Sequence, residues 1–117
     1  MPPLFVCAEE VYLATMTAKT PAQCSSMEEV REGVDALDRE LVKLLAVRQG
    51  YMEAAARIKP RAEDVRVPWR IEEVVAKVMQ TAETEGLSGR IAEPVWRELI
   101  ERCIEHEAET WKKLRSD

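Results

Sequence analysis

The stretch that decides the fold runs from residue 26 to residue 59 and reads SMEEVREGVDALDRELVKLLAVRQGYMEAAARIK. Its apolar residues recur at alternating steps of four and three, which is the heptad spacing of a helical seam. The seam positions are Val30, Val34, Leu37, Leu41, Leu44, Arg48, Tyr51, Ala55 and Ile58. The pattern therefore predicts one long amphipathic helix.

Local signals predict where this helix begins and ends. Either Ser25 or Ser26, followed three residues later by Glu28 or Glu29, makes a capping box at the start. Pro60 disfavours helical geometry for the residue before it, so the helix is expected to end at about residue 59.

Two further helices are predicted downstream. One starts around Trp69 and ends at Gly86, a normal helix stop. The other opens near Ser88 and runs to about Leu114, with a local kink expected at Pro94. Its stripe consists of Trp96, Ile100, Cys103, Glu107, Thr110 and Leu114. The fold class is therefore all-α, with one long and two shorter helices per chain. Residues 1–18 are expected to form a poorly ordered N-terminal extension, with Met16 as an alternative start, and residues 19–117 a single helical domain.

The length of the first helix predicts a dimer. At 1.5 Å per residue it measures about 50 Å, whereas a compact domain of this size has a radius of gyration of about 13 Å. Part of its seam is thus expected to meet another chain, most simply in an intertwined twofold homodimer. The alternative is a break at Gly50 that gives a short helical hairpin.

Composition excludes several classes of function. The formal net charge of −5 disfavours nonspecific nucleic-acid binding, which needs a dense positive surface. No run of about 18 apolar residues exists, so no membrane span is predicted. The three cysteines lack the spacing of a zinc site or a disulfide framework, and this pattern fits a reducing cytoplasm. Because His106 is the only histidine, neither a catalytic triad nor a two-histidine metal site is expected within one chain.

Three charged residues occupy positions that should be apolar. Arg48 lies on the seam, and Lys59 follows it by three helical turns on nearly the same face. Glu107 lies on the apolar stripe of the last helix. Three interpretations stay open for the two cations: internal salt bridges to Glu or Asp, snorkelling of the side chains at the helix end, or an anionic ligand. Glu107 is either the counter-ion of Arg48 or a hydrogen-bonding group that faces the ligand. Cys103 on the same stripe is interpreted as a small core residue.

Further arginines lie outside these two stripes. Arg61, Arg66 and Arg70 belong to the linker that leads into the second helix, where a solvated basic loop is the usual explanation. Arg31 lies about 100° around the helix axis from Arg48 and many turns away, so the two can share one ligand only across a dimer.

Together these segments resemble the all-helical chorismate mutases and the closely related isochorismate pyruvate lyases. The resemblance is carried by EEVREGVDALDRELVKLLAVRQGYMEAAARIK, then VPWRIEEVV, EGL and IEHEAETW, in this order and spacing. It covers about residues 19–114, and the KTPAQC segment before the long helix is similar to the lyase branch.

The resemblance implies a role for each charged residue. Arg31 matches an arginine that reaches a substrate carboxylate from the partner subunit, and Arg48 matches one that binds the other carboxylate. Lys59 matches a lysine that contacts a carboxylate and the breaking ether oxygen. Arg70 matches an arginine at the mouth of the second helix, and Glu107 falls where members carry Gln or Glu beside the ether oxygen.

One position departs from the family pattern. Many true mutases have a carboxylate directly after the arginine of the second helix, where it takes the ring hydroxyl of chorismate, and here that position is Ile71. The expected activity is rearrangement of chorismate to prephenate in the shikimate pathway, without metal or cofactor. The alternatives are pyruvate elimination from isochorismate to give salicylate, and a non-catalytic helical dimer that serves as an interaction module.

Overall fold

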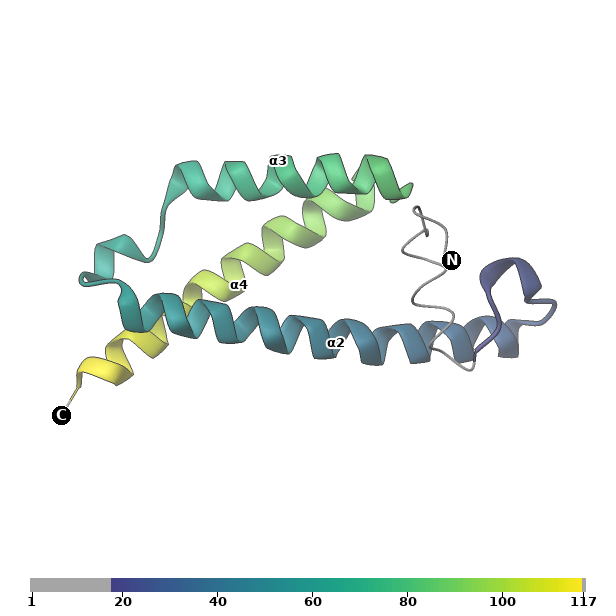
Figure 1. The fold of residues 1–117 in the computed structure, drawn as a ribbon, viewed down its shortest axis with the longest axis horizontal. Helices are drawn as coiled ribbons and strands as arrows, with labels where there is room; N and C mark the ends of the chain where they lie inside the picture. Colours follow the sequence, from purple (N-terminus) through teal and green to yellow (C-terminus); the bar gives the residue numbers. More distant parts are fainter. Residues whose placement is uncertain (1–17, 117) are drawn as a thin grey trace, which may run out of the picture. The chain divides into compact units, whose positions relative to one another are not determined.

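The computed structural model describes residues 18–116, and every element of this part of the chain is helical (Figure 1). The elements are η1 (Pro21–Gln23), α2 (Met27–Ile58), η2 (Ala62–Asp64), α3 (Pro68–Glu85) and α4 (Gly89–Arg115). The predicted all-α class with one long and two shorter helices is confirmed. Apart from Ala18, the predicted N-terminal extension lies outside the described residues.

The start of α2 is capped as the sequence predicts, and Ser26 is the capping serine. The backbone N–H of Glu29 donates to Ser26 Oγ at 3.2 Å, and the N–H of Ser25 donates to Glu29 Oε1 at 3.0 Å. Lys19 also pairs with Glu29. The hydrogen bond from Lys19, together with those from Ser25, lowers the pKa of Glu29 to about 2. The positive end of the helix dipole also stabilises a carboxylate at this position.

The other helix ends also follow local rules. The helix α2 passes Gly50 without interruption, so the alternative of a hairpin broken there is wrong. Gly86 ends α3 with a φ of 78°, a left-handed conformation that suits glycine. Ser88 begins α4 by accepting a hydrogen bond from the N–H of Arg90, and Pro94 lies inside that helix.

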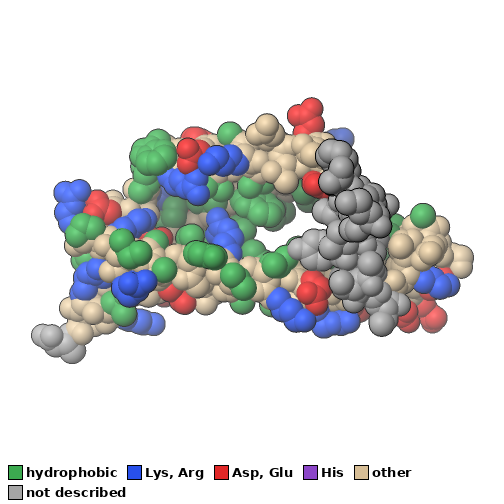
Figure 2. All heavy atoms as spheres, in the orientation of Figure 1, with side chains coloured by type: hydrophobic (Ala, Val, Ile, Leu, Met, Phe, Trp, Pro, Cys, Tyr) green, Lys and Arg blue, Asp and Glu red, His purple; other side chains and the backbone are tan. Residues whose placement is uncertain are grey.

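The chain divides into two compact units, and residues 18–46 belong to the first. This unit contains η1 and the first turns of α2, and no described residue in it is buried. The seam positions Val30, Val34, Leu37, Leu41 and Leu44 are between 38% and 50% exposed. Figure 2 shows hydrophobic side chains at the surface among Lys, Arg, Asp and Glu. Within this unit, residues 18–24 lie beside Val30, Val34 and Leu37 but leave the apolar face of this part of α2 largely exposed.

Residues 47–116 belong to the second unit, which contains the core. Its apolar buried residues are Ala56, Val65, Val75, Ala82, Ala92 and Ile100. The helices α3 and α4 pack against each other after a short turn at Leu87 and Ser88. Among the described residues, no helix combines the length and the apolar character needed to cross a membrane.

Candidate functional site

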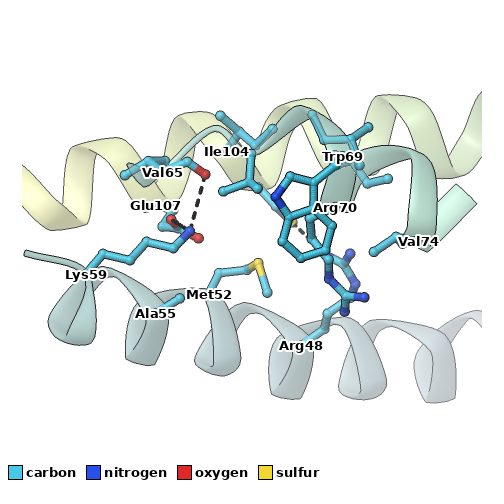
Figure 3. A pocket seen from close by; sticks show the side chains of 14 residues that line it. Arg48, Met52, Ala55, Lys59, Val65, Trp69, Arg70, Val74, Ile104 and Glu107 are labelled. Carbon is cyan, nitrogen blue, oxygen red and sulfur yellow. Dashed lines mark hydrogen bonds and ion pairs between the residues drawn. The ribbon is translucent and has the colours of Figure 1, made fainter. Parts of the chain in front are cut away.

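The second unit contains a cavity of about 320 Å³, within the usual size range of small-molecule sites. The last turns of α2, the connection to α3, α3 itself and α4 all contribute to its walls (Figure 3). Its lining residues are Arg48, Met52, Ala55, Lys59, Val65, Val67, Trp69, Arg70, Ile71, Val74, Ile100, Cys103, Ile104 and Glu107.

Helical spacing explains why one face of α2 supplies so much of this lining. Arg48, Met52 and Ala55 follow each other at steps of four and three, and Lys59 comes four residues later. Residues at such steps lie on the same face of a helix. Figure 3 shows the side chains of Arg48, Met52 and Lys59 extending from α2 towards the cavity.

At one end of the cavity, Lys59 pairs with Glu107. The two side chains, Nζ and Oε2, are 2.8 Å apart, and Lys59 Nζ also donates to the carbonyl oxygen of Val65 at 3.3 Å. The side chain of Glu107 is only 5% exposed and that of Lys59 is 25% exposed. The alternative in which Glu107 is the counter-ion of Arg48 is therefore wrong, because the connection after α2 brings Lys59 to Glu107 instead.

At the other end, Arg48 has a different kind of partner. Its Nη1 donates to Cys103 Sγ at 3.1 Å, across α2 and α4. Within residues 18–116, no carboxylate lies at salt-bridge distance from this half-buried guanidinium. A partly desolvated guanidinium whose partner among residues 18–116 is the sulfur atom of a cysteine is well suited to receive an anionic group.

The remaining predicted site residues are placed less deeply. Arg70 lines the cavity, and its Nη1 is 2.5 Å from Oε1 of Glu73 on the same helix. Three cationic side chains and one carboxylate thus line the cavity. Arg31 is exposed and belongs to the first unit, so it is not among the lining residues. In the linker, Arg61 pairs with Asp64 and Arg66 with Glu101, and both arginine side chains stay more than half exposed, in agreement with the predicted solvated basic loop.

Several lining residues had no role in the sequence prediction. Cys103, expected as a small core residue, contacts Arg48 in the cavity. Trp69, next to Arg70, lines the cavity although it is 69% exposed. The carbonyl of Val65 holds the ammonium of Lys59, and no sequence signal identifies a backbone acceptor in a loop. The position of Cys103 four residues before Glu107 was an available signal.

A second contact between α2 and α4 lies next to Glu107. Oε2 of Glu53 is 2.7 Å from Nε2 of His106, and this hydrogen bond lowers the pKa of the Glu53 carboxyl. Because His106 directly precedes Glu107, the contact helps to fix the part of α4 that carries the buried carboxylate.

Comparisons with known proteins point to one family. A family model described as chorismate mutase type II matches residues 30–108, a range that contains all five predicted site residues. The chain is also similar to a protein of Pseudomonas aeruginosa named isochorismate pyruvate lyase. The two are 28% identical over 97 residues, which cover 83% of this chain and 96% of the relative.

Proposed function

The chain belongs to the chorismate mutase type II family, and from this premise we propose that it catalyses the rearrangement of chorismate to prephenate. The observation that carries the proposal is the cavity with a Lys59–Glu107 pair at one end and Arg48 without a carboxylate at the other. Chorismate is a dicarboxylate with an enolpyruvyl ether, so it needs cations for its carboxylates and donors for its ether oxygen.

Arg48 and Arg70 are proposed to bind substrate carboxylate. A guanidinium binds such groups by charge-assisted, often bidentate hydrogen bonds. Arg48 would exchange the neutral thiol of Cys103 for an anion, which is the stronger partner. Arg70 would exchange Glu73 for the ligand at the more exposed end of the lining.

Lys59 and Glu107 are proposed to stabilise the ether oxygen as its bond breaks. An ammonium has three N–H donors, of which two are used here for Glu107 and the carbonyl of Val65. The third can donate to the ether oxygen without breaking this arrangement. A protonated Glu107 would supply a second donor. Donors already in place when negative charge develops lower the barrier without a cost of reorganisation.

A second copy of the chain is proposed to complete the site in an intertwined homodimer. Five consecutive seam positions in residues 30–44 are exposed in the single chain. Contact of so continuous an apolar stripe with water is unfavourable, and such stripes commonly mark interfaces between proteins. Arg31 lies in this part of α2, and no described carboxylate pairs with it. Its proposed role is to bind the second substrate carboxylate in the site of the partner.

Elimination of pyruvate from isochorismate, with formation of salicylate, is the second candidate. Both reactions break the same enolpyruvyl ether bond. The mutase reaction forms a carbon–carbon bond, whereas the lyase reaction moves a ring hydrogen to the enolpyruvyl methylene carbon. Two observations favour this candidate: the lyase name of the Pseudomonas relative, and Ile71 in the cavity wall where many mutases have a carboxylate.

Incubation of the purified chain with chorismate and with isochorismate, in separate reactions, tests these proposals. Chromatography should identify prephenate from chorismate, and salicylate with pyruvate if the second candidate holds. A matched incubation without the protein is the control for uncatalysed breakdown of either substrate. If neither substrate reacts faster than in this control, the catalytic proposal is wrong and a non-catalytic helical module becomes the better explanation.

A further inference from the structure

The carboxyl end of α2 is held by two side chains from the end of α4. The last carbonyls of a helix have no partners within it, and Pro60 prevents α2 from continuing. Arg115 supplies the missing donors: Nη1 donates to the carbonyl of Ala56 at 3.1 Å, and Nη2 to those of Arg57 at 3.3 Å and Lys59 at 2.7 Å. Nε1 of Trp111 donates to the same Lys59 carbonyl at 2.9 Å.

The guanidinium of Arg115 is itself fixed in place. Its central carbon lies 4.2 Å from the centroid of the Trp111 ring, and Nη1 also donates to the carbonyl of Trp111 at 3.3 Å. A cation at this point also faces the negative end of the α2 dipole. The planar fork of an arginine suits several carbonyls at once, which a single ammonium could not contact together.

One face of α4 therefore contacts both the side-chain ammonium and the backbone carbonyl of Lys59. Glu107, Trp111 and Arg115 follow each other at steps of four residues, so they lie along the same side of the helix. Glu107 holds the ammonium of Lys59, while Trp111 and Arg115 hold its carbonyl. A lysine side chain has many rotamers, so the position of its ammonium depends on both anchors.

We propose that Trp111 and Arg115 are positioning residues that set where the ammonium of Lys59 meets the substrate. The kinetic consequence rests on the proposed pericyclic function. A displacement of about 1 Å at a reacting group can strongly reduce the rate even when its cause lies away from the chemistry. Loss of this anchor should thus reduce turnover more than substrate binding, which depends mainly on the arginines.

The first test is kinetic and uses Trp111→Phe, Arg115→Ala and Lys112→Ala. Trp111→Phe keeps a ring and removes the N–H donor, whereas Lys112→Ala removes an exposed cation from the same last turn of α4. We expect kcat to fall about tenfold in the first two variants, with KM within about twofold of the parent. Lys112→Ala should match the parent. All assays are made at a temperature where circular dichroism shows each variant to be folded.

The second test needs no substrate. Brief labelling with acetic anhydride, followed by mass spectrometry, measures how fast the Lys59 amine is acetylated, with exposed Lys43 as the internal reference. Trp111→Phe and Arg115→Ala should raise the relative labelling rate of Lys59 a few-fold, and Lys112→Ala should not.

The two tests separate the possible failures. A fall in kcat together with faster labelling of Lys59 supports the positioning role. When the parent is active, a change in either measurement alone, or in neither, overturns it and leaves Trp111 and Arg115 as a helix cap only. If the parent chain turns over neither chorismate nor isochorismate, the proposed function fails, and the labelling rates alone decide whether the pair positions Lys59.

Discussion

The two halves of α2 share one heptad pattern but differ in their surroundings. In residues 47–58, Ala56 is fully buried, and Arg48, Met52 and Ala55 line the cavity. In residues 27–46 no residue is buried, and the apolar seam positions are exposed. The difference is one of partners. Side chains of α4 contact Arg48, Glu53 and Lys59 at the second half, whereas the first half has only residues 18–24 beside Val30, Val34 and Leu37 among the described residues of its unit.

This comparison teaches that the seam itself does not reveal what will cover it. The heptad spacing predicts a stripe, and the stripe is continuous through both halves. In the second half two seam positions, Arg48 and Ala55, line the cavity, whereas Tyr51 and Ile58 stay about 70% exposed. In the first half it remains apolar, as expected for a surface that a second copy of the chain would cover.

The largest effect is expected from Lys59→Ala, next to the second half of α2. Turnover should fall by about two orders of magnitude or more, because a donor to the developing charge is lost. Helicity by circular dichroism should persist. Unchanged turnover in a folded variant would remove Lys59 from the site.

A pair of variants tests whether both halves serve one site. Arg31→Ala and Arg48→Ala should each lower activity about tenfold to a hundredfold below the parent, because each removes a guanidinium that binds a substrate carboxylate. Refolded mixtures should regain activity, since a heterodimer with crossed contributions contains one intact site. If heterodimers form and their activity stays at the level of the two single variants, the proposal that the two chains share a site is wrong.

A single charge on the exposed half of α2 should disrupt the proposed dimer. Leu41→Asp places a carboxylate on the seam and should convert the proposed dimer to a monomer at micromolar concentration, because burying an unpaired charge is costly. Light scattering measures the mass. Val42→Asp is the matched control, since Val42 is 65% exposed on the same turn but off the seam, and it should leave the mass unchanged. A parent protein that is already monomeric would contradict the dimer.

Glu107→Gln sharpens the account of the second half with a smaller effect. Glutamine keeps a hydrogen-bond donor at this position and removes the charge that pairs with Lys59. Turnover of the folded variant should therefore stay within a few-fold of the parent. A much larger loss would assign Glu107 the role of a structural counter-ion to Lys59.

The smallest effect concerns the capped start of the first half. The pKa of Glu29 is lowered to about 2, so its stabilising contribution is complete above its ordinary value of 4.5 and is lost as pH falls towards 2. The melting temperature of Glu29→Gln should lie slightly below that of the parent at neutral pH, and the gap should shrink steadily below pH 4.5. Differential scanning calorimetry across this range measures it. A gap that is constant with pH would exclude ionised Glu29 as its cause.

The sequence by itself determined the helices and their ends. Ser26, Pro60, Gly86 and Ser88 act on backbone groups within about four residues, so their effects can be read without knowing the rest of the fold. The face that carries Arg48 and Lys59 followed from the same local periodicity. These features depend on neighbours in the chain.

Only the tertiary structure decided which charges meet. Lys59 and Glu107 are 48 residues apart, Arg48 and Cys103 are 55 apart, and Trp111 reaches the carbonyl of Lys59 across 52 residues. These pairings depend on how the connection after α2 and the turn at Gly86 bring α4 back against the end of α2. The sequence therefore identified Arg48 as a cation that needs a partner. Only the packing of α4 showed that Glu107 pairs with Lys59 and that Arg48 contacts the sulfur of Cys103.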